Sequence, residues 1–397
     1  VILRILASNR NREDEMTQMA LKRNDSAASA VLYMALELSK SKWKVGFECG
    51  AKRRTVNVEG GSVLGLQEAL AGAKKKFGLG EAVVVRSCYE AGRDGFWLHR
   101  LLESWGVSNL VVDPASIEVS RRARRSKTDR VDLETLLSKL RQHHGGERVW
   151  KVVRVPDPEA EAGRHLHREV ERLKKERGAL VSRIKGVLFA QGIRVERVDL
   201  KDWARRVAQF RSFDGQALAS DLQGELERAG SRLRLVEEQI KELEREQDRR
   251  VQEAAHAGGA MAMVEQLRRL KSIGRVAAWV FVMEFFGWRE FRNAKQVGAL
   301  AGLTGTPYAS GQINREQGIS KAGNRRVRAL AVEIAWLWLR YQPDSALSRW
   351  FFERFGGTGK RHRRVGIVAL ARKLLVALWR YLETGMVPEG ATLKAAI

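Results

Sequence analysis

The order of strand-forming and helix-forming stretches between residues 31 and 140 constrains this chain more than any other feature. Apolar runs predict strands, and helical spacing of apolar residues predicts helices. In chain order, the predicted elements are strands at Val31–Leu38, Trp43–Cys49 and Arg53–Val58, a helix at Val63–Phe77, a strand at Ala82–Glu90, a helix at Asp94–Trp105, a strand at Asn109–Val112 and a helix from Asp129. Three hairpin-linked strands followed by alternating helices and strands predict a mixed sheet with helices on both faces.

Four carboxylates lie at positions that such a sheet would gather. Glu37 falls in the first strand and Glu90 ends the fourth, and ligands of open α/β sheets bind at strand ends. Asp129 and Asp132 are three residues apart, so they share a face near the start of the last helix. Carboxylates of this kind bind the hard cations that act on phosphate, so we expect Mg²⁺, with Mn²⁺ as a substitute. The alternative is four solvated acids, two at exposed strand ends and two on a charged helix start.

The charge balance points to a polyanionic partner. The chain has 72 Lys and Arg against 47 Asp and Glu, a net charge of +25, which makes nucleic acid the first candidate and a membrane surface the second. We expect this charge to be spread over all regions of the chain. A basic run precedes Asp129 and is predicted to bind nucleic acid: Arg121, Arg122, Arg124, Arg125 and Lys127. No apolar run is long enough to span a membrane, and two cysteines suit a reducing, cytoplasmic setting.

Composition divides the rest of the chain. Residues 1–29 are polar and are expected to be a disordered or non-native extension, followed by the sheet domain at 30–155. In residues 156–255, apolar residues repeat every seven positions, which predicts a central helical coiled-coil region: Leu166, Leu173, Leu180 and Val187. A second such helix, about Leu222–Val251, would pair with the first as an antiparallel hairpin within one chain or as an arm between two chains.

Residues 256–397 are predicted to form a mostly helical domain with two candidate phosphate sites. Leu270–Ala278 resembles the turn of a helix-hairpin-helix module, in which a glycine lets backbone N–H groups approach a phosphate. Ala301–Gly311 is a glycine-rich loop that presents Ser310, although a Ser-Gly pair by itself is typical of a simple turn. The residues predicted to contact nucleic acid here are Lys271, Arg275, Arg315, Lys321, Asn324 and Arg325.

Two further groups of polar residues have non-catalytic interpretations. The histidines come in close pairs, and neighbouring residues on a helix do not face one point, so they are predicted to be surface residues or phosphate contacts: His143, His144, His165 and His167. Asp94 is predicted to cap the helix that follows it rather than to add a fifth carboxylate.

Taken in order, these motifs resemble a known family. The residues that carry the resemblance are Glu37, Cys88–Gly92, Lys127–Asp132, the Ser272–Gly274 turn, Ser310-Gly311 and Gly318–Asn324. The set is similar to the DEDD-type insertion-sequence transposases, RuvC-like recombinases whose better-known members are guided by a bridge RNA. The resemblance covers about Val31 to Tyr381 and implies a RuvC-like domain with the ribonuclease H fold.

The resemblance also implies roles for single residues. The acidic tetrad of the family maps onto Glu37, Glu90, Asp129 and Asp132, and its catalytic serine maps onto Ser310. Its first acid is usually aspartate, whereas this chain has Glu37. The implied enzyme cuts and rejoins double-stranded donor and target DNA with Mg²⁺ and a guide RNA, as a homodimer or homotetramer in which each site combines two subunits.

Two other classes of function remain open at this stage. A RuvC-like Holliday-junction endonuclease would need the carboxylates but not Ser310, because it hydrolyses DNA without rejoining it. An inactive nucleic-acid-binding relative would need only the basic surface. A variant of Ser310 separates the first class from a recombinase, and a test for Mg²⁺-dependent cleavage separates the second.

Overall fold

The computed structural model describes the backbone of residues 30–117, 129–254, 258–310 and 313–395. The side chains of residues 129–131, 254, 308–310 and 313–316 lie outside this description. The chain divides into two compact units, Val1–Val155 and Pro156–Ile397. None of the helices in the described ranges has the length and hydropathy that a membrane crossing requires. The finer boundaries expected within these units stay predictions.

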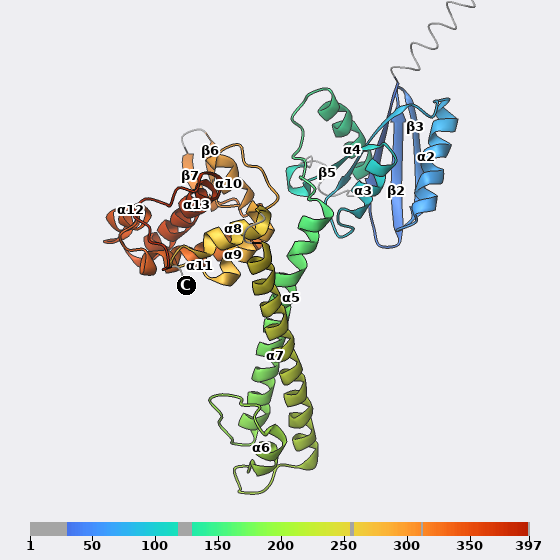
Figure 1. Ribbon diagram of the computed structural model, residues 1–397. Helices are drawn as coiled ribbons and strands as arrows, with labels where there is room; N and C mark the ends of the chain where they lie inside the picture. Colours follow the sequence, from blue (N-terminus) through green and yellow to red (C-terminus); the bar gives the residue numbers. More distant parts are fainter. Residues whose placement is uncertain (1–29, 118–128, 255–257, 311–312, 396–397) are drawn as a thin grey trace, which may run out of the picture. The chain divides into compact units, whose positions relative to one another are not determined.

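A five-stranded mixed sheet forms the centre of the first unit (Figure 1). Its strands are β1 (Val31–Glu37), β2 (Lys42–Cys49), β3 (Lys52–Glu59), β4 (Val84–Glu90) and β5 (Ser108–Val112), in the spatial order β3-β2-β1-β4-β5. β1, β2 and β3 pair in antiparallel fashion, whereas β4 is parallel to β1 and β5 is parallel to β4. The predicted mixed sheet is confirmed.

Helices cover both faces of this sheet, as the sequence predicted. Alternate residues of a strand face opposite sides, so Leu32, Met34 and Leu36 pack with α2 (Val63–Phe77) and α3 (Trp97–Ser104). Ala35 and Cys88 pack on the other face with α4 (Asp129–His144). The predicted cap at Asp94 is wrong, because Gly95 takes a left-handed φ of 69° and α3 begins only after Phe96, which makes no side-chain cap.

Two long antiparallel helices open the second unit. They are α5 (Pro158–Ala190) and α7 (Ser220–Ala254), with the short α6 (Trp203–Gln209) between them. Leu173 packs on Val236 and Ile240 along the seam, and Ile184 and Leu188 pack on Leu226 and Leu233 near the turn. Within one chain the two helices form the antiparallel hairpin, and an arm between two chains stays a prediction. We call α5 and α7 together the arm.

The rest of the second unit is a mostly helical body. Its helices are α8 (Gly259–Arg268), α9 (Arg275–Phe281), the π-helix Val282–Phe286, α10 (Ala294–Leu300), α11 (Arg325–Tyr341), α12 (Ala346–Phe355) and α13 (Lys360–Thr384). A two-stranded sheet of β6 (Gly305–Ser310) and β7 (Ile313–Ile319) interrupts them. Trp279, Trp338 and Phe351 are fully buried in the core that holds these helices together.

Candidate functional site

Glu37 and Glu90 end neighbouring strands at the same edge of the sheet. β1 and β4 run parallel, with Leu36 paired to Tyr89, so the next residue on each strand is the predicted acid. Ala35 and Cys88 face α4, and residues two positions apart share a face of a strand. Both glutamates therefore lie on the face that α4 covers, although 53 positions of sequence separate them.

α4 runs antiparallel to β1, and three contacts establish its direction. Leu133 packs closely against Gly46: if Gly46 carried a Cβ atom, that atom would lie 2.9 Å from Leu133 Cγ. Gly46 in turn pairs with Ala35 of β1. Farther along the helix, Tyr33 Oη lies 2.9 Å from His144 Nδ1. The start of α4 thus lies toward the end of β1, and its last turn lies toward the beginning of β1.

This direction brings the start of α4 toward the edge that carries Glu37 and Glu90. Asp132 is half-buried and directly precedes Leu133, while Asp129 is the first residue of the helix and its side chain lies outside the described part. Among the described side chains, no group of three or more His, Cys, Asp or Glu could hold a metal ion. The four-carboxylate site, which includes Asp129, stays a prediction.

A buried carboxylate with two partly exposed arginine partners, which the sequence did not reveal, links α4 to the sheet. Glu48 on β2 is 2% exposed, and its carboxylate lies 2.9 Å from Arg141 Nε on α4 and 3.0 Å from Arg53 Nε on β3. Removing one partner of a buried pair costs more than the pair itself contributes. Glu48 and Arg141 therefore hold the helix in the orientation that directs Asp132 toward the sheet edge.

Ser310 closes a β-hairpin instead of lying in the predicted open loop. It is the last residue of β6, and it pairs with Ile313 at the start of β7. Backbone hydrogen bonds tie the base of the hairpin to the body, from Ser320 N to Thr304 O (2.8 Å) and from Lys321 N to Gly302 O (3.1 Å). The described backbone therefore places Ser310 at the tip of a hairpin whose two ends are fixed.

The predicted nucleic-acid contacts fall in different environments. Lys271, Lys321 and Arg325 are exposed. Arg275 instead forms ion pairs with Glu244 (3.2 Å) and Asp248 (3.3 Å) on α7. The basic run at Arg121, Arg122, Arg124, Arg125 and Lys127 lies outside the described residues, as does the side chain of Arg315.

Asn324 has two structural roles in the body. Its Oδ1 accepts hydrogen bonds from the backbone N–H groups of Arg326 and Val327, so Asn324 is the N-cap of α11. Its Nδ2 donates to the Glu284 carboxylate over 3.1 Å. The cap links the end of the Ser310 hairpin to α11 within four residues of Lys321.

Glu284 is the centre of a buried charged cluster that joins the arm to the body. It lies on the π-helix Val282–Phe286, is 1% exposed, and is 2.9 Å from His167 Nε2 and 2.7 Å from Arg168 Nε on α5. Burial alone would raise the pKa of Glu284, but the hydrogen bonds from His167 and Arg168 outweigh it and hold the pKa well below its usual range.

The position of His167 contradicts its predicted surface location. Its side chain is 4% exposed, because α5 carries it against Glu284 in the core. The acid and the histidine are 117 residues apart, so no local pattern pairs them. The one available signal was a single acid within the apolar run Val282–Phe286, since a carboxylate is buried only with partners.

Comparisons with known proteins assign the class. Residues 264–349 match the model described as "Transposase IS116/IS110/IS902 family". The Sinorhizobium fredii protein named "Putative transposase y4rJ" is 42% identical over 375 residues, 91% of this chain and 94% of the relative. "Putative transposase y4qE" of the same organism is 32% identical over 267 residues, 64% of this chain and 59% of the relative. The Pseudomonas aeruginosa "Probable family 20 transposase" is 27% identical over 235 residues, 59% of this chain and 67% of the relative.

The family model and these relatives define a DNA-transposing enzyme. Within that class, the chain belongs to the IS116/IS110/IS902 family of transposases. The coarse part of the resemblance seen in the motifs is thereby confirmed.

Proposed function

We propose that this transposase cuts and rejoins DNA strands with Ser310 as its nucleophile and with Mg²⁺ bound by Glu37, Glu90, Asp129 and Asp132. Mn²⁺ would substitute, because oxygen ligands discriminate weakly between the two ions. The observation that carries the proposal is the shared edge and face of Glu37 and Glu90, toward which the start of α4 is directed. The sheet belongs to the RuvC-like type in this proposal.

The residues present fit such an ion in their chemistry. Carboxylate oxygens are the ligands that Mg²⁺ takes, and it is bound by a few of them together with substrate phosphates. A bound Mg²⁺ would neutralise negative charge on the scissile phosphate. Glu37 is one methylene longer than the aspartate usual at this position, so its carboxylate reaches farther from β1.

The serine step conserves the energy of the broken bond. The Ser310 hydroxyl loses its proton to a base and forms a bond to phosphorus, while the bond from phosphorus to one deoxyribose oxygen breaks and that strand leaves with a hydroxyl end. The phosphoserine then accepts the hydroxyl of another strand, which restores both Ser310 and a phosphodiester. Lys321 and Arg325, both exposed, lie toward the base of the hairpin and would bind phosphates farther along the same strand.

The proposal includes a guide RNA and more than one subunit. The net charge of +25 suits the simultaneous binding of donor DNA, target DNA and RNA. Purifying the expressed protein and sequencing its RNA should yield one discrete non-coding species that adjoins the element. A random RNA population would contradict guidance while leaving the transposase assignment intact.

The nucleophile is tested by trapping a protein–DNA adduct. Stalled reactions should contain DNA joined to Ser310, and Ser310→Ala should lose both the adduct and all strand exchange while it still binds DNA. Ser320→Ala is the control, because its hydroxyl has only a long 3.5 Å contact with Thr304 Oγ1, and it should retain the adduct. Peptide mapping of the DNA to another residue would refute the assignment of Ser310.

The carboxylates are tested separately. Asp132→Asn should abolish Mg²⁺-dependent cleavage yet leave folding and nucleic-acid binding intact, since it removes a charge needed for the metal. Glu68→Gln, an exposed position on α2, is the matched control on the opposite face of the sheet and should cleave normally. Wild-type cleavage by Asp132→Asn would rule out this metal site.

A further inference from the structure

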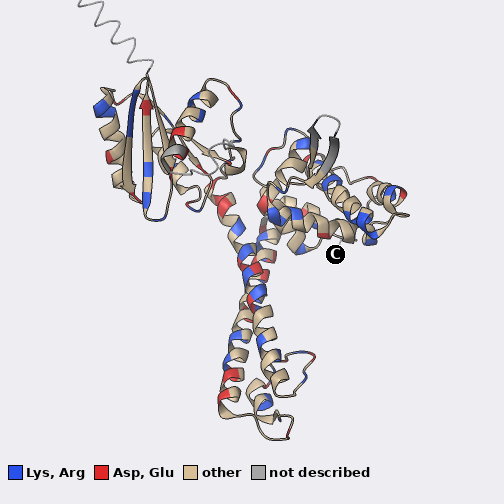
Figure 2. Ribbon diagram, turned by 180° about the vertical axis from the view of Figure 1, so that it is seen from behind, with Lys and Arg blue, Asp and Glu red and all other residues tan. Residues whose placement is uncertain are grey.

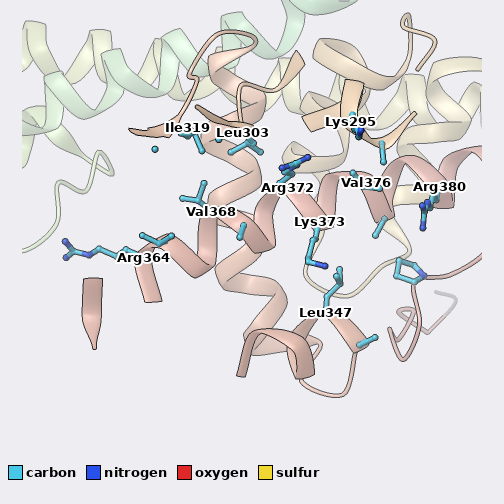
Figure 3. Close-up of a pocket in the computed structure, with 18 of the residues that line it drawn as sticks. Lys295, Leu303, Ile319, Leu347, Arg364, Val368, Arg372, Lys373, Val376 and Arg380 are labelled. Atoms are coloured by element: carbon cyan, nitrogen blue, oxygen red, sulfur yellow. The ribbon is translucent and has the colours of Figure 1, made fainter. Parts of the chain in front are cut away.

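A wide groove lies along α13 in the body of the second unit (Figure 3). Its volume is ≈ 1670 Å³, above the roughly 300 to 1,000 Å³ of sites for small ligands. α13 forms one wall, and Lys295 of α10, Leu303 and Ile319 at the base of the Ser310 hairpin lie across from it. The size and open form of the groove suit a polymer.

The groove combines cationic and apolar side chains in a regular pattern. Arg364, Arg372 and Arg380 recur every eight residues along α13, which is about 12 Å at 1.5 Å per residue. Val368 and Val376 lie midway between them in the sequence, at spacings of four residues. Among the described residues, the lining contains eight Lys and Arg side chains and one acid, Glu389. A chain of regularly spaced negative charges with apolar parts between them is the complementary ligand.

The pairing of these cations bears on what the groove binds. Within the described residues, none of the eight forms an ion pair, and Glu389 itself pairs with Arg349, which lies outside the lining (3.3 Å). Like charges held close together repel one another. A fold that gathers them without neutralising them provides a site for an external anion.

We propose that this groove binds a single-stranded stretch of DNA next to the phosphate that Ser310 attacks. The inference rests on the proposed function of Ser310. Gly305 lines the groove and starts β6, and Ser310 ends the same strand five residues later. At about 3.3 Å per residue, the strand carries Ser310 about 17 Å from the groove. A DNA strand attached at the hairpin tip would enter the groove within a few nucleotides.

The apolar floor favours a single strand over a duplex. Val368, Val376 and Leu303 contribute aliphatic surface that the bases of an unpaired strand would cover, while its phosphates meet the arginines. A duplex keeps the faces of its bases stacked inside and presents mainly its sugar-phosphate backbone to such a surface, so it would cover the valines less well. The described part of the lining includes no aromatic residue, so phosphate contacts would dominate and we expect binding with little preference for sequence.

The test is a triple variant, Arg364→Gln/Arg372→Gln/Arg380→Gln, in the full chain. Its affinity for a single-stranded DNA oligonucleotide, measured by fluorescence anisotropy across a salt series, should fall at least tenfold. The slope of log affinity against log salt should fall by about 2, because each phosphate contact on a single strand contributes about 0.7. A triple Arg→Lys variant at the same positions should restore the slope, which separates lost charge from misfolding.

A matched control removes three cations from the arm, with Lys174→Gln/Arg183→Gln/Arg249→Gln. Each of these residues already has an acidic partner, so this variant should bind the oligonucleotide as the wild type does. Blunt duplex DNA and single-stranded RNA complete the comparison. An unchanged slope in the groove variant, an equal loss of duplex binding, or a loss of RNA binding with single-stranded DNA binding retained would each overturn the proposal.

Failure of the groove and failure of the nucleophile give different results. Ser310→Ala should bind the oligonucleotide normally, because the change removes one hydroxyl group and no positive charge. If the groove variant binds the oligonucleotide as the wild type does and still forms the Ser310 adduct, the proposed DNA site in the groove is wrong and the nucleophile assignment stands. If the groove variant loses oligonucleotide binding but the wild type forms no adduct, the groove binds DNA but Ser310 is not the nucleophile. The placement of the strand beside Ser310 is then also wrong.

Discussion

Lys and Arg side chains are paired with acids in the arm but lack such partners among the described residues of the groove. α5 and α7 together contain 15 Lys and Arg and 15 Asp and Glu, whereas α13 contains 7 Lys and Arg and 1 acid. Figure 2 shows acidic and basic residues interspersed along the two arm helices. Arm cations pair with arm acids, as in Lys174–Glu244 and Arg183–Glu225, both at 2.7 Å. Net charge indicates a polyanionic partner, but ion pairing inside the protein indicates where that partner binds.

This difference corrects the expectation that the positive charge is spread over the whole chain. Residues 156–255 contain 21 Lys and Arg against 20 Asp and Glu, while residues 256–397 contain 23 against 9. The long amphipathic helices need alternating charges to support each other. The excess charge is therefore carried by the first unit and the body.

The largest expected effect concerns the one buried acid that joins arm and body. Glu284→Ala should lower the free energy of unfolding by about 1–3 kcal/mol, because it leaves the buried His167 without its hydrogen-bond partner. Chemical denaturation of the purified protein measures this change. Glu171→Gln is the matched control, since Glu171 links α5 to Arg326 of α11 through a 2.9 Å pair that is largely exposed. The control should lose less than about 1 kcal/mol, and equal losses would show that burial does not matter here.

Lowering the pH should also test the contribution of Glu284 to stability, without removing its side chain. The pKa of Glu284 is held below its ordinary value of 4.5, so the carboxylate stabilises the fold fully above that pH and loses this contribution as pH falls through the folded-state pKa. The free energy of unfolding should decline below about pH 4.5. Glu284→Gln, which cannot titrate, should show a shallower decline over the same range. Parallel profiles for the two proteins would contradict the assigned role of Glu284.

The smallest expected effect is the difference in stability between an arm variant and a groove variant. Glu246→Gln should lower the free energy of unfolding only slightly, because it breaks exposed helical pairs with Arg249 and Arg250. The groove variant Arg372→Gln should be more stable than the wild type at low salt, since it relieves repulsion between like charges. At high salt its free energy of unfolding should differ from the wild-type value by no more than that of Glu246→Gln. Thermal unfolding at two salt concentrations measures both. A groove variant that loses as much as Glu246→Gln at every salt concentration would imply hidden ion pairing in the groove.

The sheet was predictable from the sequence because its signals are local. Val63–Phe77 was predicted with the observed bounds, and β4 begins at Val84 rather than Ala82. The apolar runs that define these elements are continuous, so each can be recognised in isolation. Glu37 and Glu90 could be placed on one edge for the same reason, since parallel neighbouring strands end together.

Features that depend on distant partners were not predictable. Ser310 lies in a strand because Gly305–Ser310 pairs with Ile313–Ile319, yet neither segment alternates apolar and polar residues clearly enough to indicate a strand. His167 and Glu284 meet only because α5 packs against the π-helix. Glu48 is buried because Arg141 arrives from a helix far along the chain. Charge pairing across such distances leaves no period in the sequence.

The length of the antiparallel arm can change without changing the contacts that anchor it in the body. α5 leaves the body beside Glu284 and α7 returns to it at Arg275, so both ends of the excursion are anchored in the same region. Adding seven residues to each helix would preserve every facing position of the seam. The tip would then move outward by about 10 Å, at 1.5 Å per residue, without any change in the anchoring contacts. Relatives could therefore differ in arm length by whole heptads and still share one body, which makes the arm a spacer of adjustable reach.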